Sequence, residues 1–159
     1  MKEELLQFLR QHQPMPDHPS PSEWEQFKKA TLYFYSNPAE ECIPLFLNAF
    51  GNWKDYEICE SVQATLSQFP TKTILPYLKE ALKSRQFAVK LWSADTARFF
   101  PHDSLVPHLE KLLNSTSIEV RLCVAAALEA CGSKKARAVA INRLKYERDE
   151  DVIDILQSV

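Results

Sequence analysis

The chain has 159 residues, of which 45% are apolar and 25% charged, so it can bury one ordinary core and is too apolar to be disordered throughout. Only two glycines occur, which disfavours a sheet protein rich in tight hairpins and excludes glycine-rich phosphate loops. The 19 Lys and Arg residues and 21 Asp and Glu residues give a net charge of −2, so no global field attracts nucleic acid or an anionic membrane.

The first twelve residues predict a short amphipathic helix whose apolar side carries Leu5, Leu6, Phe8 and Leu9. The segment is too acidic and too short for a signal peptide, and no apolar run approaches the roughly 20 residues of a membrane span. Residues 13–21 carry four of the ten prolines, which predicts an extended linker. The helix at 1–12 could therefore cap the following domain or form a docking arm. We expect a cap, because a terminal repeat has no neighbour to cover its apolar face.

From residue 22 onward, the sequence predicts a series of helical hairpins. Ser22 and Glu25 have the spacing of a capping box, which predicts a helix start at Ser22. Thr73 and Ser104 are predicted N-caps of second helices. The turns are predicted at four pairs of residues, Asn37 with Pro38, Phe69 with Pro70, Phe100 with Pro101, and Cys131 with Gly132.

A period of about 31 residues relates these hairpins, since Val120 corresponds to Val89 and Ile58, and Leu109 corresponds to Leu78. One hairpin per period predicts an all-α fold, an α-solenoid. The predicted repeat domain spans 22–159, with units at 22–52, 53–84, 85–115 and 116–147 and a partial unit with a lone helix at 148–159. The predicted core contains Ile58, Leu78, Val89, Leu109, Val120, Val124 and Leu128.

The fourth unit reads Val-Arg-Leu-Cys-Val-Ala-Ala-Ala-Leu over residues 120–128 and resembles the first helix of a HEAT repeat. The third unit is similar at Val89, Lys90, Ser93, Ala94 and Ala97. Ser115 and Ser84 stand where the family usually has an aspartate. The resemblance implies about four HEAT-like hairpins in a right-handed superhelix, with the second helices along the inner curve. It also implies binding of another protein, without catalysis.

Two enzymatic alternatives can be compared with the sequence. Metal-dependent hydroxylases of this architecture carry His-Glu pairs, but no histidine here precedes a glutamate, and His102 and His108 point about 240° apart around a helix. DNA glycosylases built from HEAT-like repeats are similar in using tryptophan, aspartate and arginine. Trp92, Asp95 and Arg98 share a predicted helix stripe, although core packing or an Asp95–Arg98 salt bridge is the preferred interpretation.

The four cysteines form no Cys-x-x-Cys pair, which favours buried thiols in the reducing cytoplasm, and the sequence predicts neither a metal nor another cofactor. Cations concentrate in the second helix of the fourth unit, and aligned second helices add two lysines. This predicted partner-binding set contains Lys134, Lys135, Arg137, Arg143, Lys145, Lys79 and Lys83.

The resemblance implies a scaffold or adaptor without enzymatic activity. The cation set is either a solvated helix face or a dock for an acidic protein segment. A small bacterial immunity or inhibitor protein that neutralises a toxin is one alternative, and a HEAT-like nucleic-acid binder or DNA glycosylase is another. The acidic balance disfavours nucleic acid, no membrane partner is expected, and we expect a monomer or weak oligomer.

Overall fold

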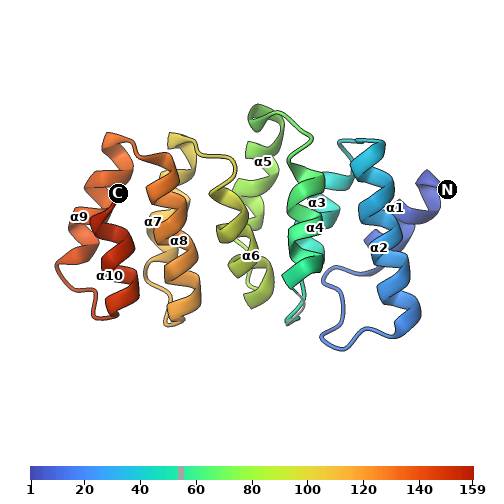
Figure 1. Ribbon diagram of the computed structural model, residues 1–159, viewed down its shortest axis with the longest axis horizontal. Helices are drawn as coiled ribbons and strands as arrows, with labels where there is room; N and C mark the ends of the chain where they lie inside the picture. Colours follow the sequence, from blue (N-terminus) through green and yellow to red (C-terminus); the bar gives the residue numbers. More distant parts are fainter. Residues whose placement is uncertain (54–55) are drawn as a thin grey trace. The chain divides into compact units, whose positions relative to one another are not determined.

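A computed structural model describes residues 1–53 and 56–159, and these residues form α-helices, one 3-10 turn and no strand (Figure 1). The all-α prediction is therefore confirmed for the described chain. The chain divides into two compact units, Met1–Val89 and Lys90–Val159, and each is described by itself.

The first unit consists of two hairpins and an additional N-terminal helix. Its helices are α1 (Lys2–Gln11), α2 (Pro21–Ser36), α3 (Cys42–Ala49), α4 (Tyr56–Leu66) and α5 (Thr71–Ala81). Helix α2 packs beside α4 and α3 packs beside α5, so corresponding helices of the two hairpins lie next to each other. Helix α1 packs on α2 and α3 and buries Leu5, Leu6 and Leu9 there.

Aromatic rings form the centre of this unit. Phe46 of α3 makes edge contacts with Phe27 and Phe34 of α2, each at a centroid distance of 6.0 Å. Phe27 also contacts Trp53 at 5.5 Å, and Trp53 contacts Trp24 at 5.1 Å. Because aromatic side chains bury large areas, this cluster joins the first hairpin to the chain that follows it.

The proline-rich segment follows the surface of this cluster. Met15 is fully buried, and its N–H donates to the carbonyl oxygen of Ala49 at 3.0 Å. The indole Nε1 of Trp53 donates to the carbonyl oxygen of Pro16 at 3.1 Å. Gly51 permits this close approach, since an added Cβ would lie 2.8 Å from the Met15 carbonyl oxygen.

Two predicted helix starts are wrong. The capping box of α2 uses Ser20 and Glu23 instead of Ser22 and Glu25, because Pro21 fits the first helical position, where its missing N–H costs nothing. Helix α5 starts after Pro70, which places Thr73 inside the helix instead of at its N-cap.

The N-cap predicted after the third turn is also wrong. His102, not Ser104, is the N-cap of the 3-10 turn η1 (Asp103–Leu105), and its side chain accepts a hydrogen bond from the Ser104 N–H. The predicted turns themselves are confirmed, because α2, α4 and α6 end just before them and α8 ends at Cys131, with Gly132 as its C-cap.

The second unit contains most of α6 (Phe87–Ala97), together with η1, α7 (Val106–Leu112), α8 (Ile118–Cys131), α9 (Lys134–Leu144) and α10 (Glu150–Gln157). Helix α8 packs against α7, α9 and α10, while α9 also packs against α7 and α10. Gly132 ends α8 in the left-handed conformation, with φ of 55°, which glycine adopts without steric cost. All seven residues of the predicted core are at most 3% exposed, so that prediction is confirmed.

Candidate functional site

Four predicted partner-binding cations are exposed, three on α9 (Lys134–Leu144) and one, Lys145, at its C-cap. Lys134, Lys135, Arg137 and Lys145 are exposed, and Ile141 between them is 56% exposed. We call these five residues the α9 basic face. The opposite side of α9 buries Ala136 and Ala140, which orients the cations away from the core. No acidic residue occurs from 134 to 146, so the positive charge of this face is not neutralised within its own helix.

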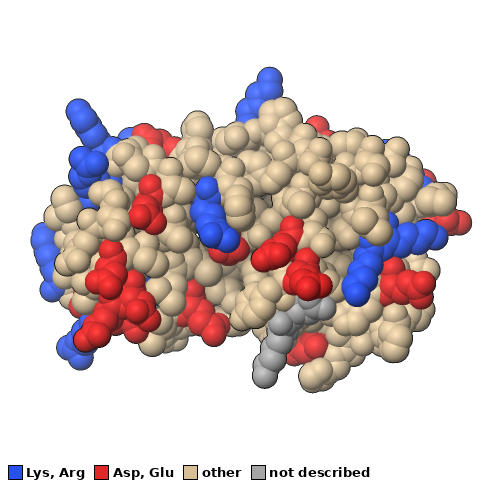
Figure 2. Space-filling view, in the orientation of Figure 1, with Lys and Arg blue, Asp and Glu red and all other residues tan. Residues whose placement is uncertain are grey.

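Local structure accounts for the position of this face. The Ser133 side chain caps α9 by accepting a hydrogen bond from the Ala136 N–H at 3.1 Å. Helix geometry then brings Lys134, Ile141 and Lys145 onto a single stripe. In Figure 2, Lys and Arg side chains lie along the α9 edge of the second unit, while Asp and Glu side chains gather at the start of α10.

Arg143 must be removed from the exposed set. Its side chain is 12% exposed, and its Nη2 lies 2.7 Å from Glu147 Oε2. Its guanidinium also lies 4.8 Å from the Tyr146 ring centroid. Because Arg143 is one turn from Glu147, the helix directs it into an internal ion pair instead of toward solvent.

The partner of Arg143 is a buried carboxylate that the sequence analysis missed. The Glu147 side chain is 1% exposed and also receives hydrogen bonds from Arg121 of α8 at 3.1 and 3.2 Å. Burial by itself would raise the pKa of Glu147. Hydrogen bonds from the Asp149 N–H, Arg143, the Arg148 N–H and Arg121 outweigh burial and lower that pKa to about 2. The i,i+4 spacing from Arg143 was the one sequence signal for this site.

Lys79 and Lys83 belong to the first unit and are therefore described apart from the α9 basic face. Lys79 is half-buried, and Lys83 Nζ lies 2.7 Å from Glu80 Oε1. This ion pair joins two exposed side chains at i,i+3 spacing, so it contributes little to stability.

Trp92 and Asp95 lie on α6 and Arg98 directly follows it, but the three side chains do not form an open trio. Trp92 is 9% exposed, and Arg98 Nε lies 3.1 Å from Asp95 Oδ1. The preferred interpretation, core packing with an Asp95–Arg98 salt bridge, is confirmed. The neighbouring hydroxyl of Ser93 is fully buried and makes no hydrogen bond within the described residues.

The cysteines and histidines of the described residues belong to no cluster of metal-ligating side chains. None of the four cysteines is in a disulfide, and burial raises the pKa of Cys42 and of Cys123 to about 12, which leaves both thiols protonated at neutral pH. Within residues 1–53 and 56–159, no three His, Cys, Asp or Glu side chains are grouped as metal ligands.

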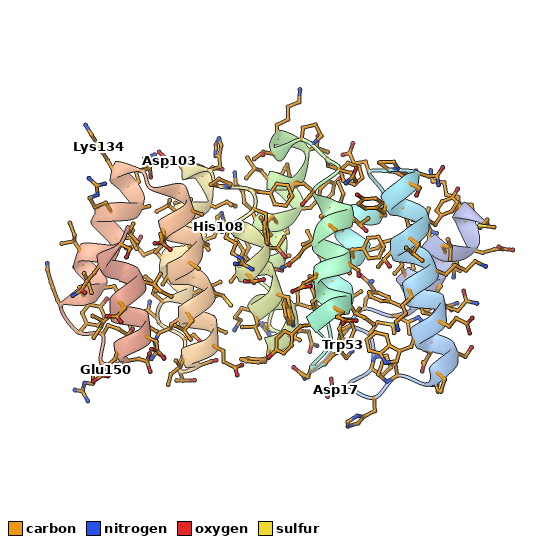
Figure 3. All side chains as sticks on the ribbon, in the orientation of Figure 1. Asp17, Trp53, Asp103, His108, Lys134 and Glu150 are labelled. Atoms are coloured by element: carbon orange, nitrogen blue, oxygen red, sulfur yellow. The ribbon has the colours of Figure 1, made fainter. Side chains whose placement is uncertain are left out.

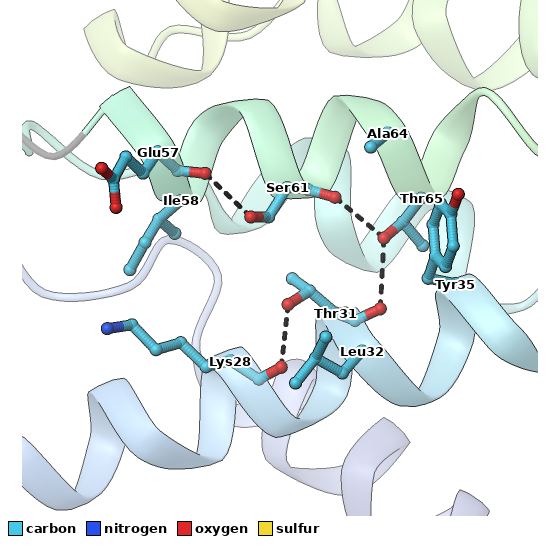
Figure 4. A pocket seen from close by; sticks show the side chains of 9 residues that line it. All are labelled: Lys28, Thr31, Leu32, Tyr35, Glu57, Ile58, Ser61, Ala64 and Thr65. Carbon is cyan, nitrogen blue, oxygen red and sulfur yellow. Dashed lines mark hydrogen bonds between the residues drawn. The ribbon is translucent and has the colours of Figure 1, made fainter.

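A separate groove lies between α2 and α4 in the first unit and has a volume of about 380 Å³ (Figure 4). Its lining is largely apolar, and Leu32 and Tyr35 on its α2 side are 71% and 50% exposed. The hydroxyls along its floor are engaged with backbone carbonyls, including Thr65 Oγ1 to Thr31 O at 3.2 Å and Ser61 Oγ to Glu57 O at 2.8 Å. The groove can therefore accept apolar groups, but these hydroxyls are not free to activate a substrate.

No described helix combines the length and apolar character needed to cross a membrane. Residues 105–134 match the family model of the HEAT repeat, and no curated protein matches the chain in sequence. The matched segment contains α7 and α8, whereas the predicted repeat boundaries pair α8 with α9. In the phase of the match, α9 opens the next repeat. Whether α9 is the first or the second helix of a repeat thus depends on where the repeat begins, whereas its exposed residues are the same in both cases.

Proposed function

We propose that the protein is a non-catalytic interaction module that binds a partner protein through the α9 basic face. One observation carries the proposal: four exposed cations surround the exposed Ile141 on a helix that has no acidic residue. The HEAT-repeat match at residues 105–134 supports this class of function, because HEAT repeats generally mediate protein interactions. Cysteines outside disulfides agree with the cytoplasm as the compartment in which we expect this activity.

The chemistry of the face suggests the chemistry of its partner. Ile141 offers an apolar contact, and Lys134 and Lys145 lie on the same stripe about two turns away on one side and about one turn away on the other. A segment with an apolar side chain flanked by carboxylates would complement this arrangement. Exposed charges of this kind orient a partner and accelerate association more than they add affinity.

The two alternatives differ in how well the surface supports them. An immunity or inhibitor protein would also act by binding a protein, so it is a special case in which the partner is a toxin. A nucleic-acid binder has less support, because Arg98 is paired with Asp95 and acidic side chains lie at the start of α10 beside the basic helix.

Site-specific photo-crosslinking tests the proposal. A photoreactive amino acid at position 141 is expected to capture a protein with an acidic segment, and the adduct should disappear when Lys134→Glu and Lys145→Glu are added. The matched control places the same group at position 32, another highly exposed leucine-sized site, which lies in the first unit. Adducts of equal identity and yield from positions 141 and 32, insensitive to the two charge reversals, would contradict the proposal.

A further inference from the structure

The basic helix α9 lies beside a helix of opposite charge. Helices α9 and α10 pack together and are joined by only five residues, 145–149, so they run antiparallel. Helix α10 exposes Glu150, Asp151 and Asp154 and carries no Lys or Arg. In Figure 3, Lys134 and Glu150 lie at opposite ends of the second unit, as this antiparallel arrangement requires.

The buried positions define which side chains point away from the unit. Helix α9 buries Ala136 and Ala140, which leaves Lys134, Ile141 and Lys145 on its opposite side. Helix α10 buries Val152 and Leu156, which leaves Glu150, Asp154 and Gln157 on its opposite side. The two helices thus expose a basic stripe and an acidic stripe next to each other, and we call this pair of stripes the α9–α10 surface.

We infer that the α9–α10 surface pairs with the same surface of a second copy of the chain, about a two-fold axis parallel to both helices. This axis sets α9 of each copy against α10 of the other. Lys145 then lies at the level of Glu150 of the second copy, and Asp154 of the second copy lies between the levels of Arg137 and Lys145.

Charge complementarity selects this occupant and this axis. A two-fold axis perpendicular to the helices would set α9 against α9, which places like charges together and costs free energy. The parallel axis gives opposite charges in both halves, as an isologous interface needs. The net charge of −2 adds little repulsion between copies. Because the contacts are largely exposed ion pairs, the dimer should be weak and should weaken further with salt.

This inference rests on the proposed function in one respect, namely that the α9 basic face accepts carboxylates. It adds that the carboxylates of a second copy compete for that face. Self-association is measured on the purified chain with no other protein present. If no dimer forms, the inference fails but the proposed binding of an external partner stands. If no external partner binds, the proposed function fails but the measured dimer stands.

Sedimentation equilibrium of two charge-reversed variants provides the test. The first variant carries Arg137→Glu and Lys145→Glu, so carboxylates replace the cations that face Glu150 and Asp154 of the second copy. The second variant carries Glu150→Lys and Asp154→Lys, so cations replace the carboxylates that face Arg137 and Lys145. The unsubstituted chain should dimerise at low salt and dissociate as salt is added. Each variant alone should associate at least about tenfold more weakly. An equimolar mixture of the two variants should form the heterodimer, because every contact is complementary again.

Far-ultraviolet circular dichroism first verifies that each variant is folded. If a double variant does not fold, the single variants Lys145→Glu and Glu150→Lys are mixed in the same test. A chain that stays monomeric at low salt and millimolar concentration would overturn the inference. Variants that dimerise as strongly as the unsubstituted chain, or a mixture that associates no better than its components, would also overturn it.

Discussion

The guanidinium Nε of Arg121 lies 3.1 Å from the Oε2 atom of Glu147, which connects α8 to the segment between α9 and α10. Arg121 also donates from Nη1 to the carbonyl oxygen of Ser115 at 2.9 Å. Ser115 stands where the HEAT pattern usually has an aspartate, so its side chain offers no negative charge. Glu147, 26 residues beyond Arg121, supplies the carboxylate and simultaneously pairs with Arg143.

Replacing Glu147 by glutamine should destabilise the protein. The substitution preserves the shape of the side chain but leaves Arg121 and Arg143, each 12% exposed, without their counter-charge. Removal of one member of a buried ion pair typically costs about 3 to 5 kcal/mol. Urea titration of the full chain measures this free energy, and Glu129→Gln, an exposed position on α8, provides the matched control. Equal unfolding midpoints for both variants would mean that the buried cluster contributes nothing to stability.

Glu147 should also make stability depend on pH. Its pKa is lowered from an ordinary value of 4.5 to about 2 in the folded chain. The contribution of a carboxyl group with a lowered pKa is fully present above the unfolded pKa and is lost as the pH falls through the folded pKa. The stability difference between the unsubstituted chain and Glu147→Gln should thus be constant from pH 7 to about 5.5 and should shrink from there toward pH 2. A difference that stays the same at pH 3 and pH 7 would contradict this assignment.

Leu109 lies in the core of the second unit and is fully buried on α7. Leu109→Ala removes several buried carbon atoms and leaves a cavity, so it should cost about 2 to 5 kcal/mol. Leu32→Ala is the natural control, because Leu32 is 71% exposed and its loss should change the unfolding free energy by at most about 0.5 kcal/mol. If both variants melt at the same temperature, the assignment of Leu109 to the core is wrong.

Gly51 should tolerate no side chain. A Cβ atom there would lie 2.8 Å from both the Met15 carbonyl oxygen and the Trp53 ring atom Cε2, and the indole is itself hydrogen-bonded to Pro16. Gly51→Ala should therefore displace the proline-rich segment and cost about 1 to 3 kcal/mol. Asn52→Ala, at the exposed neighbouring position, should have little effect. Wild-type stability for Gly51→Ala would show that this contact relaxes freely.

The sequence was sufficient for the features that depend on periodicity. The period of 31 residues predicted both the turns and the buried residues. Val120 and Leu109, which this period placed on the apolar side of their helices, are fully buried. Helix starts were less predictable, since Ser20 and Ser22 both have a glutamate three residues later and the position of Pro21 decided between them. The candidate site was predicted in part. Exposure of Lys134 and Lys145 follows from helix geometry, but the burial of Arg143 depends on Arg121 and Glu147, which only the folded chain brings together.

The rate at which the crosslinked partner associates with the chain tests the central claim most directly. Lys134→Glu with Lys145→Glu should lower the association rate constant at low salt and leave the unfolding free energy within about 0.5 kcal/mol. The difference should diminish as salt is added. The matched control, Lys28→Glu with Lys29→Glu on the exposed side of α2, should associate at the unsubstituted rate. Equal rates for all three proteins at low salt, or tight and salt-sensitive binding of the unsubstituted chain to plain duplex DNA, would contradict a protein-binding role for the α9 basic face.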